Sequence, residues 1–194
     1  MPPSAKFTKE EIISTALEIT RESGFEAITA RAIGAKLKSS ARPIFTVFNS
    51  MEEVLNETIC AVKDIYKEYI LSGLENEIPF KGVGMAYISF ARKEPNFFRL
   101  LFMSPNKESS ELETILPAID DNSDKILNSI IQAYRLSREK SYELYKLIWI
   151  FTHGIASLCA TNVCRFSDEE ISELLTSEFI AILKKFKNIQ GDIK

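Results

Sequence analysis

The stretch from Thr29 to Phe48, TARAIGAKLKSSARPIFTVF, restricts the fold more than any other part of the chain. It indicates two very short helices, one that starts after Thr29 and runs to about Leu37 and one that follows Ser40 and ends near Val47. Helices this short are marginal in water, so they need a shared core. Two of them joined by a tight turn are typical of a helix-turn-helix, whose second helix can enter a DNA major groove.

Helical periodicity continues along the rest of the chain, and no alternation typical of strands persists. Helices are expected at about 9–23, 51–72, 80–93, 96–103, 123–136, 139–163 and 168–187. Three of them begin with a capping box: Thr8 with Glu11, Ser50 with Glu53, and Ser167 with Glu170. Breaks are expected at Gly73 and Pro79. Residues 104–124 indicate a loop with a helical turn near 111–116. The pattern predicts an all-α fold of about nine helices.

Charge is distributed unevenly along the chain, although the net charge is only −3. Between Arg31 and Arg42 there are four basic side chains and no acidic one. The chain as a whole is therefore not a basic coat for nucleic acid, but the suspected reading segment carries a small basic face.

The three cysteines are few and odd in number, which argues against a disulfide framework and favours a reducing cytoplasm. The first residues lack the apolar core of a signal peptide. Residues 147–164 carry no formal charge, yet Thr152, His153 and Asn162 make them too polar for a convincing membrane span. A helix buried on nearly all sides is the favoured interpretation, and we expect a cytoplasmic protein without a membrane anchor.

A longer pattern continues through the two short helices: T-x-x-x-I-x-x-x-L-x-x-S-x-x-P-I-F-x-x-F-x-x-x-E-E-V, from Thr29 to Val54. Together with the capped helix before it, this pattern resembles the DNA-binding domain of TetR/AcrR-family transcriptional regulators. Far downstream, Trp149 and His153-Gly154 resemble the W…HG…L helix of one C-terminal branch of that family. The two resemblances together span nearly the whole chain.

The resemblance implies an all-α homodimer with an N-terminal three-helix helix-turn-helix domain and a C-terminal effector-binding and dimerisation domain. Here these domains would be residues 1–50 and 51–194, with the helix at about 51–72 linking them. The dimer would form through the helices at about 139–163 and 168–187, whose uncharged segment suits an apolar interface. The expected partners are double-stranded operator DNA, a second copy of the chain and an unknown, largely apolar effector. The expected role is that of a repressor.

The sequence departs from the family's common pattern at three positions. Lys38 lies in the turn, where glycine is usual, and Phe45 replaces a tyrosine that often contacts phosphate. Met51 lies where a phosphate-binding lysine is usual. Loss of two phosphate contacts would weaken non-specific affinity, because phosphate neutralisation supplies much of it.

Ten residues are the expected DNA-contacting set: Thr29, Arg31, Lys36, Lys38, Ser40, Ala41, Arg42, Pro43, Phe45 and Thr46. Arg42 can contact guanine bidentately or bind phosphate, and Thr46 can contact a thymine methyl group or a phosphate. Thr29 and Ser40 are expected helix caps, a role compatible with phosphate contact. The lysines and Arg31 are alternatively ordinary surface charges.

Aromatic side chains in the second half of the chain are first of all expected core residues. The same side chains could line an apolar effector pocket with a few polar groups. The candidates for that pocket are Tyr87, Phe90, Phe98, Phe102, Met103, Trp149 and His153.

Two other functions remain open alternatives. A helical enzyme is disfavoured, because no nucleophile with a base, phosphate loop or cluster at metal-ligand spacing is present, so no cofactor or metal is expected. A helical ligand-binding or adaptor dimer that no longer reads DNA is the stronger alternative, since Phe45 and Met51 replace family phosphate contacts. A redox role for Cys159 and Cys164 is disfavoured, because residues five apart share a helix face poorly.

Overall fold

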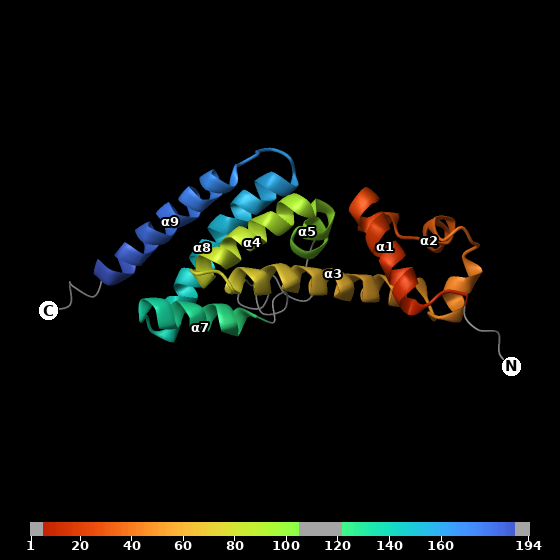
Figure 1. Ribbon diagram of the computed structural model, residues 1–194, viewed down its shortest axis with the longest axis horizontal. Helices are drawn as coiled ribbons and strands as arrows, with labels where there is room; N and C mark the ends of the chain where they lie inside the picture. Colours follow the sequence, from red (N-terminus) through yellow and green to blue (C-terminus); the bar gives the residue numbers. More distant parts are fainter. Residues whose placement is uncertain (1–5, 105–121, 189–194) are drawn as a thin grey trace. The chain divides into compact units, whose positions relative to one another are not determined.

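A computed structural model describes residues 6–104 and 122–188 of the chain (Figure 1). These residues form eight α-helices and two short 3₁₀ helices, with no strand among them. The predicted all-α class is therefore confirmed. The helical turn expected near 111–116 lies outside the described residues.

The elements follow one another as α1 (Lys9–Ser23), η1 (Phe25–Ala27), α2 (Ala30–Lys36), η2 (Arg42–Thr46), α3 (Met51–Leu74), α4 (Pro79–Lys93), α5 (Pro95–Phe102), α7 (Ser123–Tyr134), α8 (Arg138–Ala160) and α9 (Asp168–Asn188). Their ends agree with the expected ranges to within a few residues, except at residues 40–47. There, a 3₁₀ helix replaces the expected α-helix.

The chain divides into two compact units. The first comprises Met1–Tyr66 and Glu94–Pro105, and the second comprises Lys67–Lys93 and Asn106–Lys194. Helix α3 therefore contributes to both units, and α5 belongs to the first although it follows α4 of the second.

The first unit has its own apolar core, formed by α1, α2, η2 and the start of α3. The core residues are Ile12, Ala16, Ile19, Ile28, Ile33, Ile44, Phe48 and Val54. Helix α1 begins with the predicted capping box, because Thr8 accepts from the Glu11 N–H and the Glu11 carboxylate accepts from the Thr8 N–H. It ends at Gly24, which has φ +87°. The caps fix where α1 starts and stops, and the buried isoleucines fix which face packs inward.

The capping box expected at the start of α3 is only half formed. The Ser50 hydroxyl accepts from the Glu53 N–H at 3.2 Å, as expected. The Glu53 carboxylate, however, accepts from the backbone and side-chain amides of Asn49 instead of from the Ser50 N–H. Asn49 offers two donors, whereas Ser50 offers one backbone N–H, so the carboxylate makes more hydrogen bonds one residue earlier.

Gly73 does not end α3, contrary to the expected break. A β-carbon at Gly73 would lie 2.7 Å from the Gly82 carbonyl oxygen, so this glycine allows a close approach of two backbones. Gly73 therefore serves packing against Gly82, and the helix continues to Leu74.

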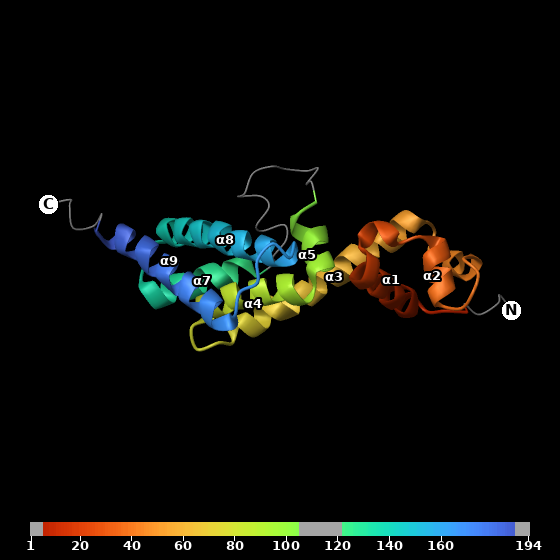
Figure 2. The ribbon, with the colours of Figure 1, turned by 90° about the horizontal axis from the view of Figure 1, so that it is seen from above.

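The second unit is a bundle in which α4 packs on α8, while α7 and α9 contact both helices (Figure 2). Its buried side chains include Tyr87, Phe90, Leu144 and Ile148. An ion pair between Arg92 of α4 and Asp168 of α9 joins two of these helices. The predicted capping box of Ser167 and Glu170 starts α9. No helix of the described residues is both long and apolar enough to span a bilayer.

Candidate nucleic-acid interface

Helix α2 and η2 are joined by a turn that requires a left-handed residue. The Thr29 hydroxyl caps α2 by accepting from the Ala32 N–H at 3.0 Å. The helix ends at Lys36, and Lys38 then takes φ +51° while Ser39 N–H donates to the Gly34 carbonyl at 2.8 Å. Glycine adopts this conformation without the steric cost that a β-carbon brings. The turn position where the family commonly has glycine is therefore conformationally demanding in this chain too.

Gly34 allows the segment after the turn to lie against α2. A β-carbon at Gly34 would come within 3.0 Å of both Ala41 N and Ser40 C, which are backbone atoms that cannot move aside cheaply. Gly34 is not among the site residues expected from the sequence, although a glycine inside a short helical pattern is a signal for close packing.

The reading segment is a 3₁₀ helix, and the expected α-helix with Ser40 as its cap is wrong. The element η2 covers Arg42–Thr46, is preceded by Ala41, and has no side-chain cap. Pro43 has no N–H to donate, and the Ile44 N–H bonds to the Ala41 carbonyl three residues back. The segment between the Lys38 turn and Phe48 is only long enough for one or two helical turns, a length at which 3₁₀ helices are common.

The two faces of η2 differ in exposure. Ile44 and Phe48 are each 1% exposed and belong to the core, whereas Phe45 is 48% exposed. Arg42 and Thr46 are also exposed. The Thr46 hydroxyl donates to the Pro43 carbonyl at 2.6 Å, so its proton is already engaged within η2. The result is an outward face with one guanidinium, one aromatic ring and one threonine.

The basic side chains near this face fall into two groups. Among the described residues, Arg31, Lys38 and Arg42 are exposed and have no acidic partner. The Lys36 ammonium instead donates to Glu22 at 2.8 Å and to Glu18 at 3.0 Å, both on α1.

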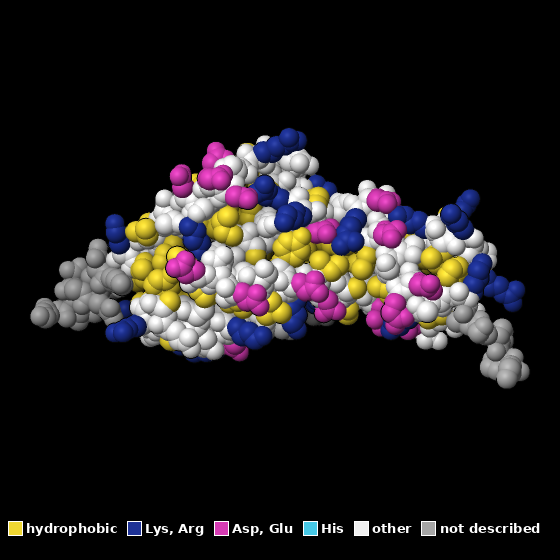
Figure 3. All heavy atoms as spheres, in the orientation of Figure 1, with side chains coloured by type: hydrophobic (Ala, Val, Ile, Leu, Met, Phe, Trp, Pro, Cys, Tyr) yellow, Lys and Arg dark blue, Asp and Glu magenta, His cyan; other side chains and the backbone are white. Residues whose placement is uncertain are grey.

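These hydrogen bonds, first the one to Glu22 and then the one to Glu18, raise the pKa of Lys36. The two negative charges exceed the single positive charge of Lys36, so Lys36 is the least free of the four basic residues to bind a phosphate. Figure 3 shows Lys and Arg side chains over α2 and the segment after it.

The remaining members of the expected set lie on the same surface with different exposure. Thr29 and Ser40 are exposed, and Ala41 and Pro43 are half-buried. Met51, at the start of α3, is partly buried and packs against the core of the first unit. It therefore contributes to packing at a position where the family pattern has a cation.

The seven residues expected to bind an effector do not form one site. Tyr87, Trp149 and His153 cluster on α4 and α8, where the Tyr87 hydroxyl lies 2.9 Å from His153 Nδ1. The indole stacks on the imidazole, with centroids 4.9 Å apart. Burial lowers the pKa of His153, which favours the neutral ring. Phe90 packs edge-on against Tyr69 in the same unit.

The other three candidates belong to the first unit. The rings of Phe98 and Phe102 pack together at 5.1 Å, and Met103 is 45% exposed. Helix α5 is fixed on α1 by Arg21, which pairs with Glu94 at 3.0 Å and lies over the Phe97 ring at 4.9 Å. Arg21 thus joins α1 to α5 within the first unit.

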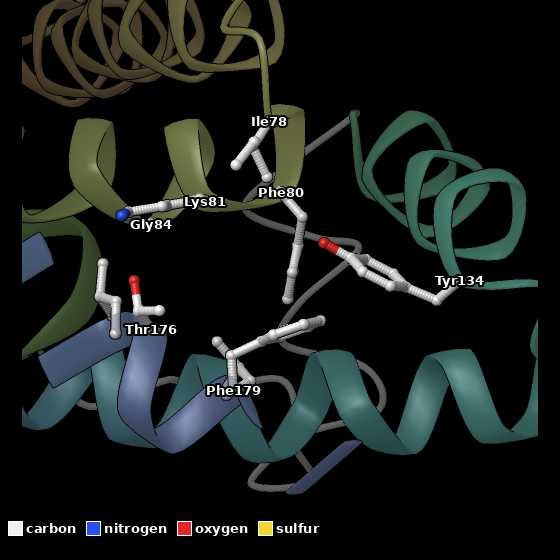
Figure 4. A pocket seen from close by; sticks show the side chains of 9 residues that line it. Ile78, Phe80, Lys81, Gly84, Tyr134, Thr176 and Phe179 are labelled. Atoms are coloured by element: carbon white, nitrogen blue, oxygen red, sulfur yellow. The ribbon is translucent and has the colours of Figure 1, made fainter. Parts of the chain in front are cut away.

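A cavity of about 140 Å³ lies elsewhere in the second unit, among α4, α7, α8 and α9 (Figure 4). Its lining includes Phe80, Lys81, Gly84, Tyr134, Thr176 and Phe179. None of these residues was expected from the sequence. They come from three helices, and no local pattern shows which faces converge.

Comparison with known proteins identifies the family of this chain. Residues 80–179, more than half of the chain, match the family described as "Tetracyclin repressor-like, C-terminal domain". The chain belongs to the TetR family. The matched residues run from α4 into α9 and include α5, which belongs to the first unit.

A solved structure supports the TetR fold over nearly the whole length. It is that of a protein assigned to the TetR-family transcriptional regulators from Mesorhizobium loti MAFF303099, with a TM-score of 0.56. The match covers 91% of this chain and 95% of the other at 15% identity, a level that supports the fold alone. A search of curated proteins gave no match.

Membership in the TetR family establishes a transcriptional regulator, and such regulators are not enzymes. The family generally binds DNA and an effector and forms dimers. Within residues 6–104 and 122–188, no group of three His, Cys, Asp or Glu side chains could hold a metal ion.

Proposed function

We propose that this TetR-family protein is a dimeric transcriptional repressor that reads operator DNA through η2 and is released by a small effector. The observation that carries the proposal is the two-faced η2 segment. Ile44 and Phe48 anchor it in the core, and Arg42, Phe45 and Thr46 lie outward. An exposed aromatic ring beside an unpaired arginine has no evident structural role within the first unit, and both suit the edges of bases.

Each outward residue has a distinct role in this proposal. Arg42 donates to guanine O6 and N7 or to phosphate, and Phe45 contacts sugars or a thymine methyl group. Thr46 uses its methyl group for thymine, because its hydroxyl proton is engaged with Pro43. Arg31 and Lys38 meet phosphates.

The turn and cap residues complete the proposed DNA surface. The positive end of α2, capped by Thr29, favours a nearby phosphate. The DNA backbone can approach this surface closely at Ser40, Ala41 and Pro43, because their side chains are small. Lys36 contributes only if a phosphate displaces Glu18 and Glu22.

The proposed dimer uses an apolar stripe on α8 together with α9. Ile150 is 52% exposed and Leu158 is 37% exposed, and Gly154 lies between them at helical spacing. A β-carbon at Gly154 would meet nothing within 4 Å in one chain, so this glycine leaves room for a partner helix. Helix α9 adds Ile180, which is 44% exposed. A two-fold dimer would present two η2 segments to successive major grooves, about 34–36 Å apart or somewhat more.

Effector control is proposed to act through the α4–α5 connection. Glu94 is the single residue between α4, in the second unit, and α5, which packs on α1 in the first. This same residue forms the ion pair with Arg21. A ligand that favours one position of α4 would therefore bias the attachment of α5 to the DNA-binding unit.

The test is binding of the purified protein to DNA from upstream of its own gene, measured by fluorescence anisotropy. Arg42→Ala with Thr46→Ala should weaken specific binding by about tenfold or more, since base contacts are each worth roughly 1–3 kcal/mol. Lys125→Ala, an exposed change on α7, is the matched control and should leave the affinity unchanged. Unchanged affinity in the double variant would instead favour the alternative.

That alternative is a ligand-binding or adaptor dimer that no longer reads DNA. The pairing of Lys36 with two carboxylates favours it, as do the non-donating Phe45 and the core-packed Met51. We favour the repressor because three other basic side chains remain available. Its site of action would be the cytoplasm, which three free cysteines also suit.

A further inference from the structure

We infer that the cavity among α4, α7, α8 and α9 binds a small aromatic carboxylate, with Lys81 holding the carboxylate group. This inference deepens the proposed function, since it names the chemical class of the effector. It rests on the size of the cavity, on its walls and on two unused donors (Figure 4).

The size of the cavity limits the ligand to about one ring. Its volume is about 140 Å³. Apolar protein cavities of roughly 150 Å³ accommodate benzene. A ligand with two fused rings would need the helices to separate.

The walls favour an aromatic ring over an aliphatic chain. Phe80 and Phe179 meet edge to face with centroids 5.8 Å apart, and Tyr134 lies 4.8 Å from Phe179. Such rings offer both edges and faces to a further ring. Gly84 keeps this space open beside Leu175, because a β-carbon there would lie 3.1 Å from Leu175 Cδ1.

Two hydrogen-bond donors at the cavity have no acceptor among the described residues. These are the Lys81 ammonium and the Tyr134 hydroxyl. Burial raises the pKa of Tyr134, so the hydroxyl keeps its proton at neutral pH and can donate it. The Thr176 hydroxyl already donates to the Ser172 carbonyl at 2.7 Å. A ligand carboxylate would provide an acceptor for an unused donor at the cavity, and the cationic Lys81 ammonium would bind it most strongly.

The same arrangement disfavours a cationic ligand. Three aromatic rings could by themselves form a cage for an ammonium group. The Lys81 charge at the same cavity opposes that choice. The positive charge of Lys81 therefore favours an aromatic carboxylate over an aromatic ammonium ligand, although the rings alone would accept either.

The experiment is isothermal titration calorimetry of the intact protein with four probes: benzoate, benzyl alcohol, benzylamine and acetate. Benzoate should bind with a dissociation constant on the order of 0.1 mM, as expected for so few atoms. Benzyl alcohol should bind several-fold more weakly, and benzylamine and acetate should not bind measurably. Benzylamine binding as tightly as benzoate, or no benzoate binding at all, would overturn the inference.

Variants then locate the site. Lys81→Met should weaken benzoate binding by roughly fivefold to tenfold and change benzyl alcohol binding by less than twofold. Lys93→Met removes an exposed lysine from the same helix and is the matched control. Thr176→Met should fill the cavity and weaken both ring ligands. Equal benzoate affinity in wild type and Lys81→Met would assign binding to another place.

This measurement is independent of DNA. If benzoate binds at Lys81 but leaves DNA affinity unchanged, the ligand inference is supported and effector release is contradicted. If DNA binding is specific but benzoate does not bind, the ligand inference alone fails.

Discussion

Replacing Lys38 by glycine should stabilise the protein and weaken its binding to DNA. Lys38 adopts φ +51° in the turn between α2 and η2. An L-residue with a β-carbon pays about 1–2 kcal/mol for this conformation. Glycine avoids that strain but loses about 0.5–1 kcal/mol more backbone entropy on folding. The net gain in the free energy of unfolding should therefore be about 0.5–1 kcal/mol.

Thermal unfolding followed by circular dichroism measures this gain. For a chain of this size, the gain corresponds to a rise in Tm of about 1–4 °C. Lys38→Ala is the control, because alanine keeps the β-carbon and its strain but removes the charge. It should leave Tm nearly unchanged.

DNA binding separates the charge from the strain. Both Lys38 variants remove one cation from each subunit of the proposed dimer. If Lys38 contacts phosphate, the slope of log affinity against log salt should become less negative by about 2 in both variants. A Tm gain in Lys38→Ala equal to that in Lys38→Gly would refute the strain argument, and an unchanged salt slope would refute the phosphate contact.

Three further predictions concern other parts of the chain. Gly34→Ala should lower the free energy of unfolding by about 1–3 kcal/mol in denaturant titrations, because its β-carbon meets backbone at 3.0 Å; unchanged stability would show that the turn can move. Gly154→Leu should yield folded monomers in analytical ultracentrifugation while Asn128→Leu stays dimeric, and a dimeric Gly154→Leu would place the interface elsewhere. Burial lowers the pKa of His153, so its contribution to the free energy of unfolding is present above pH 6.5 and is lost as pH falls through the lower folded-state pKa. His153→Gln should weaken this pH dependence of stability. An identical stability–pH profile in the variant would contradict the prediction.

Local signals predict the helices of this chain well. The caps at Thr8 and Ser167 and the positive-φ glycine Gly24 mark helix ends through features of near neighbours in sequence. The buried pair Ile44 and Phe48 follows from i, i+4 spacing on a short segment. Such features depend on a few adjacent residues, so they can be read without the tertiary structure.

Features that depend on distant residues were not predictable in the same way. Lys36 meets Glu18 and Glu22 only because α2 packs on α1, which removes it from the freely available cations. The cavity brings Lys81 together with Tyr134 from helices far apart in sequence. The segment before η2 lies against Gly34 of α2, a close approach that neither propensity nor periodicity encodes.

The central claim is that η2 reads a specific DNA sequence. The most direct measurement is the affinity of the wild-type protein for a fragment from upstream of its own gene, against a scrambled fragment, at 50 and 200 mM salt. We predict binding at least roughly 10³-fold tighter to the native fragment, with affinity falling as salt rises at a slope of about −4 if Arg31 and Lys38 contact phosphate in both subunits. Equal affinity for the two fragments, or no salt-sensitive binding to either, would contradict the claim.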